Sequence, residues 1–137
     1  MTLPAPPDFL TISFRPDLNI LVVRWQRLIS LAEMQQGYLH LLEHAAYHNC
    51  RHWLLDGRRR FNTDREGAQW MVSTFLPLLH PRLGQRTYLA YLLAPVTLRE
   101  QDADAAFPPP AYFLDKPFLG ERFVEEGEAI SWLQHQP

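Results

Sequence analysis

Apolar and polar residues near the start of the chain follow the pattern of β-strands. Residues 9–14 (FLTISF) alternate between the two kinds, and residues 20–25 (ILVVRW) are apolar and rich in β-branched side chains. Residues 15–19 (RPDLN), which separate them, carry the proline and asparagine typical of a turn. We therefore predict that the fold opens with an antiparallel β-hairpin.

A long helix is predicted after this hairpin. Ser30 and Glu33 have the spacing of a capping box, in which each side chain bonds to the backbone of the other residue at a helix start. The helix should run to about His48. Apolar side chains recur at helical spacing and define its buried face: Leu31, Met34, Tyr38, Leu41, Leu42 and Ala45.

A second helix is predicted to begin at Thr63, because Thr63 and Glu66 repeat the capping-box spacing. Proline has no backbone N–H group to donate, so Pro77 should kink or end this helix. Pro81 and Gly84 should close the segment. Its inner face is predicted to hold four apolar residues: Ala68, Met71, Phe75 and Leu79.

The remaining segments complete the set of elements. Residues 52–56 (HWLLD) are apolar without strict alternation, which is typical of a central strand covered on both faces. The next strand is predicted over residues 86–95. A short helix is predicted over 98–106, and an edge strand over 121–126. An amphipathic helix is predicted over 125–134. Its inward side chains should be Ala129, Trp132 and Leu133.

Strands that alternate with helices imply crossover connections and a mainly parallel sheet. The predicted order ββαβαβ(α)βα therefore indicates an α/β fold with a mixed, mainly parallel sheet of about five strands, opened by an antiparallel hairpin and flanked by helices. A length of 137 residues fits one domain. We assign residues 1–137 to it, with 1–8 as a flexible, proline-rich lead-in.

Composition excludes several classes of protein. The apolar share of 47% and the charged share of 20% are those of an ordinary globular protein, and a net charge of −2 argues against a nucleic-acid binder. No apolar run approaches the roughly 20 residues that span a bilayer, and the N-terminus lacks the pattern of a signal peptide. A single cysteine, Cys50, permits no internal disulfide, which favours a cytoplasmic setting.

Charge is unevenly distributed along the chain. Residues 1–98 hold ten arginines against seven acidic residues, whereas residues 99–137 hold eight acidic residues against three basic ones. Patches of opposite charge steer association between proteins. The two patches are consistent with a homodimer or with a contact to another protein. They are equally consistent with a soluble surface that has no further role.

The stretch LLDGRRRFNTDREG, residues 54–67, holds the main candidate site. Loops at the carboxyl ends of strands commonly bind ligands in open α/β sheets, and arginine can hold a carboxylate or phosphate with two hydrogen bonds. The alternative is that the arginines are solvated or pair with nearby acids, while Asp56 accepts bonds within its own loop. The candidate anion- or partner-binding residues are Asp56, Arg58, Arg59, Arg60 and Thr63.

Other chemistry finds little support in the sequence. Histidines recur four residues apart at His40, His44, His48 and His52, but His40 and His44 fall opposite the predicted buried face and should face water. A native metal site is not expected there, since it would lack a closed shell. Cys50 is predicted to lie in the core. We expect no catalytic residue set, no metal and no cofactor.

The chain resembles STAS-like domains over roughly residues 9–135. This group includes bacterial anti-sigma-factor antagonists and bacterial proteins assigned to the CRAL-TRIO group. The resemblance rests on the element order and on the segment Asp56-Gly57-Arg58-Arg59, with an irregular loop and a helix after it. It also rests on a closing pattern made by Phe123, Glu128, Ala129, Trp132 and Leu133.

What the resemblance implies is a regulatory module that binds other proteins. The antagonists carry a phosphorylated serine where the second helix begins, whereas Thr63 is the only hydroxyl residue at that place in this chain. Arg58 to Arg60 could stabilise a phosphate on Thr63, but Asp64 and Glu66 would repel it. A phosphorylation switch is therefore not the expected mechanism.

Two functions remain as hypotheses. The first is a non-enzymatic protein-interaction or regulatory module. The second is a small-molecule or lipid-binding module with a pocket between the sheet and residues 107–118, part of the proline-rich connection 107–120. An enzyme ranks third, because no complete set of nucleophile and base is evident.

Overall fold

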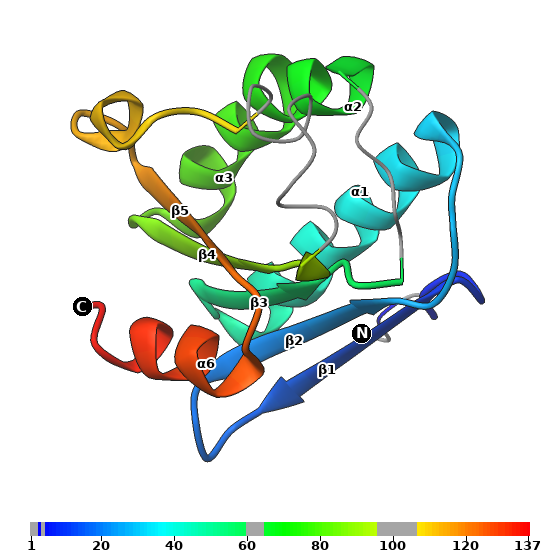
Figure 1. The fold of residues 1–137 in the computed structure, drawn as a ribbon. Helices are drawn as coiled ribbons and strands as arrows, with labels where there is room; N and C mark the ends of the chain where they lie inside the picture. Colours follow the sequence, from blue (N-terminus) through cyan, green and yellow to red (C-terminus); the bar gives the residue numbers. More distant parts are fainter. Residues whose placement is uncertain (1–2, 4, 60–64, 96–106) are drawn as a thin grey trace.

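The fold is built on one sheet whose five strands lie side by side in chain order (Figure 1). The computed structural model describes residues 3, 5–59, 65–95 and 107–137. β1 pairs antiparallel with β2, and all later neighbours are parallel, so the predicted fold class is confirmed. The strands are β1 Leu10–Arg15, β2 Ile20–Trp25, β3 His52–Asp56, β4 Thr87–Leu92 and β5 Phe118–Phe123.

Helix α1, Leu31–His48, follows the predicted bounds and begins with the predicted capping box. The Ser30 hydroxyl accepts a bond of 3.2 Å from the backbone N–H of Glu33, and the Glu33 carboxylate accepts one of 3.0 Å from that of Ser30. Hydrogen bonds from the Arg27 side chain and from Ser30 lower the pKa of Glu33 to about 2. The helix therefore starts where its sequence signal lies.

The buried arc of α1 is wider than the sequence indicated. His44 is buried and His40 is half-buried, so the prediction that both face water was wrong. On the same stripe of the helix, Gly37 lies beside Trp25 and His48 stacks on Phe14 at 4.4 Å between ring centroids. The hairpin thus covers a side of α1 that apolar spacing alone did not reveal.

The second helical segment runs through both prolines. Helix α2, Arg65–Trp70, continues into the π-helical turn η1, Met71–Phe75, and then into helix α3, Leu76–Leu83. In η1 the N–H of Leu76 reaches back five residues to the carbonyl of Met71.

The segment does not end at Pro77, which is the second residue of α3 directly after η1, and Pro81 lies inside that helix. Gly84 closes it with φ of 76°, as predicted, whereas closure at Pro81 is wrong. The predicted start at Thr63 lies outside the described residues.

Two layers of side chains bury the sheet. Helices α1 and α3 cover one face, whereas α6, Glu126–Gln134, covers the other (Figure 1). Alternate strand residues divide accordingly: Val23 and Leu55 lie in the larger layer, and Val22 and Leu54 in the layer under α6. Every residue of β3 is buried, which confirms its central position.

Residues 107–137, the described end of the chain, differ from the prediction in the bounds of β5 and in a 3-10 helix, η2 Pro110–Phe113, within the proline-rich connection. β5 is the predicted edge strand, but it begins at Phe118 rather than 121 because it pairs with β4 from Thr87 onward. Helix α6 buries Ala129 and Leu133, while Trp132 is half-buried against Phe123. The predicted helix 98–106 lies outside the described residues. None of the described helices has the length and apolar character needed to cross a membrane.

Gly37 sets the distance between α1 and the end of β2. A Cβ atom on Gly37 would lie 2.5 Å from Cη2 and 2.7 Å from Cζ3 of Trp25, closer than real contacts allow. The Trp25 ring is buried and also packs against Tyr38 at 5.3 Å, so it has little room to move. The glycine is therefore required for close packing at this point.

We expect Gly37→Ala to lower the free energy of unfolding by about 1–3 kcal/mol, the usual cost of overpacking a core. Gly127→Ala is the matched control, because nothing lies within 4 Å of a Cβ there. It should leave stability unchanged or raise it by up to about 1 kcal/mol through helix propensity. Urea unfolding of both variants measures this, and equal stability of the two would contradict the packing explanation.

Candidate functional site

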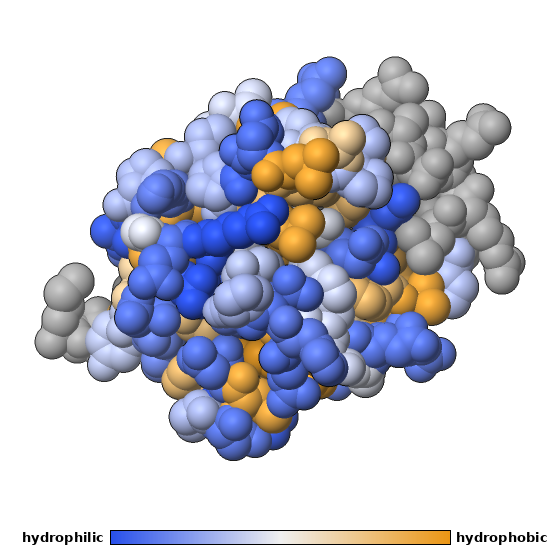
Figure 2. All heavy atoms as spheres, turned by 90° about the vertical axis from the view of Figure 1, so that its left-hand side faces the viewer, coloured by the Kyte–Doolittle hydropathy of each residue, from blue (hydrophilic) through white to orange (hydrophobic). Residues whose placement is uncertain are grey.

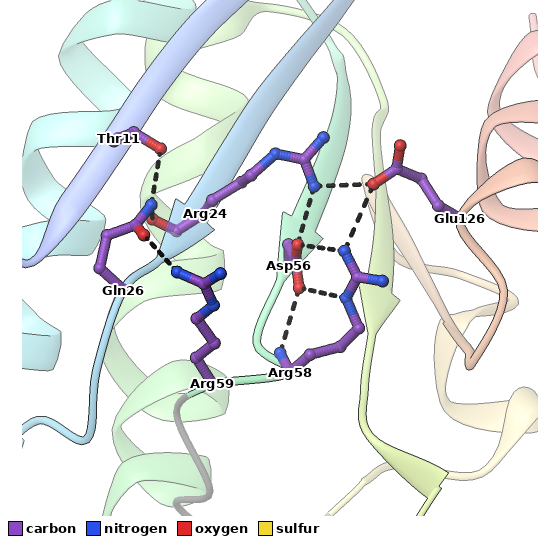
Figure 3. A network of polar contacts seen from close by, with 7 residues as sticks. All are labelled: Thr11, Arg24, Gln26, Asp56, Arg58, Arg59 and Glu126. Carbon is purple, nitrogen blue, oxygen red and sulfur yellow. Dashed lines mark hydrogen bonds and ion pairs between the residues drawn. The ribbon is translucent and has the colours of Figure 1, made fainter.

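A groove of about 490 Å³ opens at the carboxyl ends of β2 and β3, beside the start of α6. This is the edge of a parallel sheet where ligands commonly bind. We call it the polar groove. Its lining residues are Arg24, Trp25, Gln26, Asp56, Arg58, Arg59 and Glu126, most of which are drawn in Figure 3.

Asp56 lies at the base of the network as the last residue of β3. Its carboxylate is buried, and it accepts four hydrogen bonds. Arg24, its register neighbour on β2, donates from Nη1 at 2.7 Å. Arg58 donates from its backbone N–H at 3.1 Å, from Nε at 3.0 Å and from Nη2 at 2.8 Å. The carboxylate thus ties two strands and the following loop together.

These bonds determine the charge state of Asp56. Burial by itself raises the pKa of a carboxyl group, because it disfavours the charged form. Hydrogen bonds from the side chain and backbone of Arg58, and then from Arg24, outweigh burial and lower the pKa of Asp56 below its ordinary value. Asp56 is therefore ionised near neutral pH.

Arg24 connects Asp56 to the first residue of α6. The same Nη1 atom donates to Asp56 and to Oε1 of Glu126, each at 2.7 Å. Its hydrogen bond to Glu126 raises the pKa of Arg24. Arg58 is also near this carboxylate, with 3.6 Å between Nη2 and Oε1 of Glu126. Both arginines therefore share both carboxylates (Figure 3).

Arg59 lies on the other side of the groove and has a neutral partner. Its Nη1 donates to Oε1 of Gln26 at 3.0 Å. Gln26 in turn donates to the hydroxyl of Thr11 at 3.2 Å, which fixes its amide against β1. The guanidinium of Arg59 is exposed and is held in place without an acidic partner among the described residues (Figure 3).

Backbone bonds place the loop that carries these arginines. The N–H of Gly57 donates to the carbonyl of Leu92 on β4 at 2.8 Å, one residue after β3 ends. The next residue, Arg58, turns back so that both its backbone and its side chain reach Asp56. The loop thus presents Arg58 and Arg59 at the same edge of the sheet.

Three of the five candidate residues predicted from the sequence lie in the groove: Asp56, Arg58 and Arg59. Arg60 and Thr63 lie outside the described residues. The predicted pairing of Asp56 with an arginine and with a backbone N–H of its own loop is confirmed.

Sequence reasoning missed Arg24, Gln26 and Glu126. A signal for Arg24 existed, since it is the one charged residue within the apolar run ILVVRW. Glu126 lies 102 residues from Arg24 along the chain and had no such signal.

Other reactive side chains lie away from the groove. Cys50 is buried as predicted, and burial raises the pKa of its thiol, so it is a poor nucleophile. Its Sγ contacts the carbonyl oxygens of Asn19 and His52 at 3.5 and 3.4 Å. Within the described ranges, no three His, Cys, Asp or Glu residues gather closely enough to hold a metal ion.

No family model, no curated protein and no solved structure matches the chain.

We expect Asp56→Asn to lower the free energy of unfolding by about 1–3 kcal/mol near neutral pH, because two guanidinium groups lose a charged acceptor. A carboxyl group whose pKa is lowered on folding stabilises the fold above its unfolded pKa, about 3.9, and loses that effect as pH falls through the folded pKa. The difference in free energy of unfolding between wild type and variant should therefore be largest above about pH 5 and should decrease below about pH 4.

Urea unfolding between pH 3 and pH 7 measures this dependence. Asp17→Asn is the control, since Asp17 also binds one arginine, Arg15, with two hydrogen bonds but lies in an exposed turn. It should change stability little. An Asp56 variant with the same stability loss at every pH would show that shape, not charge, explains the effect.

Proposed function

We propose that this protein is a non-enzymatic interaction module that binds an acidic segment of a protein partner in the polar groove. The observation that carries the proposal is the arrangement of three guanidinium groups at one sheet edge. Arg24 and Arg58 are oriented by carboxylates, while Arg59 is oriented by the amide of Gln26. A site with positioned arginines needs little reorganisation to receive an anion.

Donor groups remain available for a ligand in the contacts that the described residues make. A guanidinium has five N–H donors, and both Arg24 and Arg59 use only Nη1. Arginine keeps its charge at any ordinary pH and binds carboxylates in a planar, two-bond geometry. Among the described lining residues, three arginines stand against two carboxylates, and this excess of positive charge favours an acidic partner.

The chemistry of the groove favours binding over catalysis. A general base needs a pKa near the working pH and a free oxygen. Asp56 has a lowered pKa, and both of its oxygens accept bonds from arginine. The buried thiol of Cys50 has a raised pKa and lies outside the residues that line the groove.

The face of the molecule drawn in Figure 2 shows no large apolar patch that would be an alternative binding surface. The large apolar side chains that are exposed come from α1, α3 and two connecting segments, and the face in Figure 2 is mostly hydrophilic with small, separate apolar patches. Apolar interaction sites are usually larger and continuous. Among the residues that the structure describes, the exposed large apolar ones are Leu28, Leu39, Tyr47, Leu78 and Leu114.

The segment 107–118, where a ligand pocket was the second hypothesis, packs its own rings together. Phe113 contacts Phe107, Tyr112 and Phe118, with centroids 5.2 to 6.3 Å apart, and Phe113 and Phe118 are buried. These contacts support a packed connection, so we place the contact surface at the polar groove.

The resemblance to STAS-like domains supports a regulatory role of the same kind. It predicts a module that acts by binding another protein, and it remains a prediction from the sequence. Since the switch serine of the anti-sigma-factor antagonists has no counterpart here, we propose that binding does not depend on phosphorylation of the loop after β3.

We expect Arg59→Gln to weaken binding of a capped hexaglutamate peptide about threefold to tenfold, because one charge-assisted contact is lost. Its stability should be close to wild type, since Arg59 is exposed. Arg15→Gln is the matched control, with the same change of charge at the opposite end of the β1–β2 hairpin. Isothermal titration calorimetry at low salt, with hexaglutamine as the neutral peptide, measures both.

Equal weakening by Arg15→Gln, or equal binding of hexaglutamine, would contradict the proposed site. Light scattering of the protein alone tests whether the acidic segment comes from a second copy of the chain. A dimer that Arg59→Gln dissociates and Arg15→Gln leaves intact would identify a second copy as the source of the acidic segment.

A further inference from the structure

The carboxylate of Glu126 is already bound where an acidic partner would bind. We infer that Glu126 acts as an internal substitute ligand that closes the Arg24–Arg58 part of the polar groove in the free protein, and that a carboxylate of the partner replaces it. This inference rests on the proposed function and assigns a regulatory role to a residue of the same site.

The two carboxylates of the groove differ in how firmly they are held. Asp56 is buried at the end of a central strand and accepts four hydrogen bonds from two arginines. Glu126 is about one-third exposed, and its contacts with both arginines go through Oε1 alone. Asp56 is therefore part of the framework, whereas Glu126 is the carboxylate that can leave.

Replacement of Glu126 exchanges one carboxylate for another. Within the described part of the chain, its only close bond is the 2.7 Å contact with Arg24, since the contact with Arg58 is 3.6 Å. Arg24 keeps its bond to Asp56 when Glu126 moves away, so its guanidinium stays in place. The incoming carboxylate then binds an arginine pair that is already oriented. The free energy of its binding is reduced only by the loss of the contact between Glu126 and Arg24.

Geometry allows this exchange to happen at the groove opening. Glu126 enters the network from the first turn of α6, on the side of the groove away from Arg59 and Gln26 (Figure 3). Its side chain is about one-third exposed and belongs to no strand, so it can turn towards solvent without unwinding one. A peptide that contacts Arg59 could therefore extend a second carboxylate to Arg24.

Glu126 also has a simpler explanation, which a control can test. Acidic residues in the first turn of a helix stabilise it through the helix dipole, wherever their side chains point. Glu128 lies in the same first turn, is exposed and is not among the residues that line the groove. The two positions therefore share the dipole effect, but only Glu126 contacts the arginines.

We expect Glu126→Gln to bind capped hexaglutamate about threefold to tenfold more tightly than wild type, because the internal competitor is removed. Glu128→Gln makes the same change of net charge and should bind less than twofold more tightly. Glu126→Asp keeps the charge but shortens the side chain, so it should also tighten binding. Calorimetry measures all three, and thermal unfolding checks that each variant is folded.

The outcomes distinguish a failure of this inference from a failure of the proposed function. If wild type binds the peptide and Glu126→Gln binds no more tightly than Glu128→Gln, the inference is wrong and the proposed function stands. Weaker binding by Glu126→Gln would show that Glu126 helps to hold the peptide, which also overturns it. If neither wild type nor Glu126→Gln binds hexaglutamate, both proposals fail.

Discussion

A carboxylate buried at the end of the central strand must be paired, because an isolated charge in that position would cost several kcal/mol. Asp56 meets this requirement with four hydrogen bonds from Arg24 and Arg58. These bonds link β2, β3 and the loop after β3, and Arg24 extends them to α6 through Glu126. The pairing of this one charge orients Arg24 and Arg58 in the polar groove.

The fold brings these partners together by ordinary means. Parallel strands that run in chain order place the ends of β2 and β3 at the same sheet edge, in register at Arg24 and Asp56. Close packing of α1 against the end of β2, which Gly37 permits, fixes the backbone from which Arg24 projects. A site built on strand ends and held by a buried carboxylate has its arginines oriented before a ligand arrives, which suits the proposed binding of an acidic partner.

Local signals in the sequence were enough for most of the fold. The hairpin, the capping box at Ser30 and the central strand at 52–56 follow from patterns within a few residues, and the structure confirms them. The buried His44 and the helix that continues past Pro77 could not be found this way, because each depends on a neighbouring element or on a π-helical turn.

The same limit applied to the candidate site. The arginines of the loop after β3 could be recognised in the sequence as candidate site residues. Arg24 and Glu126 become part of the site only through the register of β2 with β3 and the packing of α6.

The most direct test of an acidic partner in the polar groove is an NMR titration that follows the Nε–Hε signals of the arginine side chains. With increasing hexaglutamate, the signals of Arg24, Arg58 and Arg59 should shift together and reach saturation, while that of Arg15, at the far end of the hairpin, stays in place. Shifts of equal size at all four arginines, or no saturable shift at the groove, would contradict the claim that this groove receives the acidic partner.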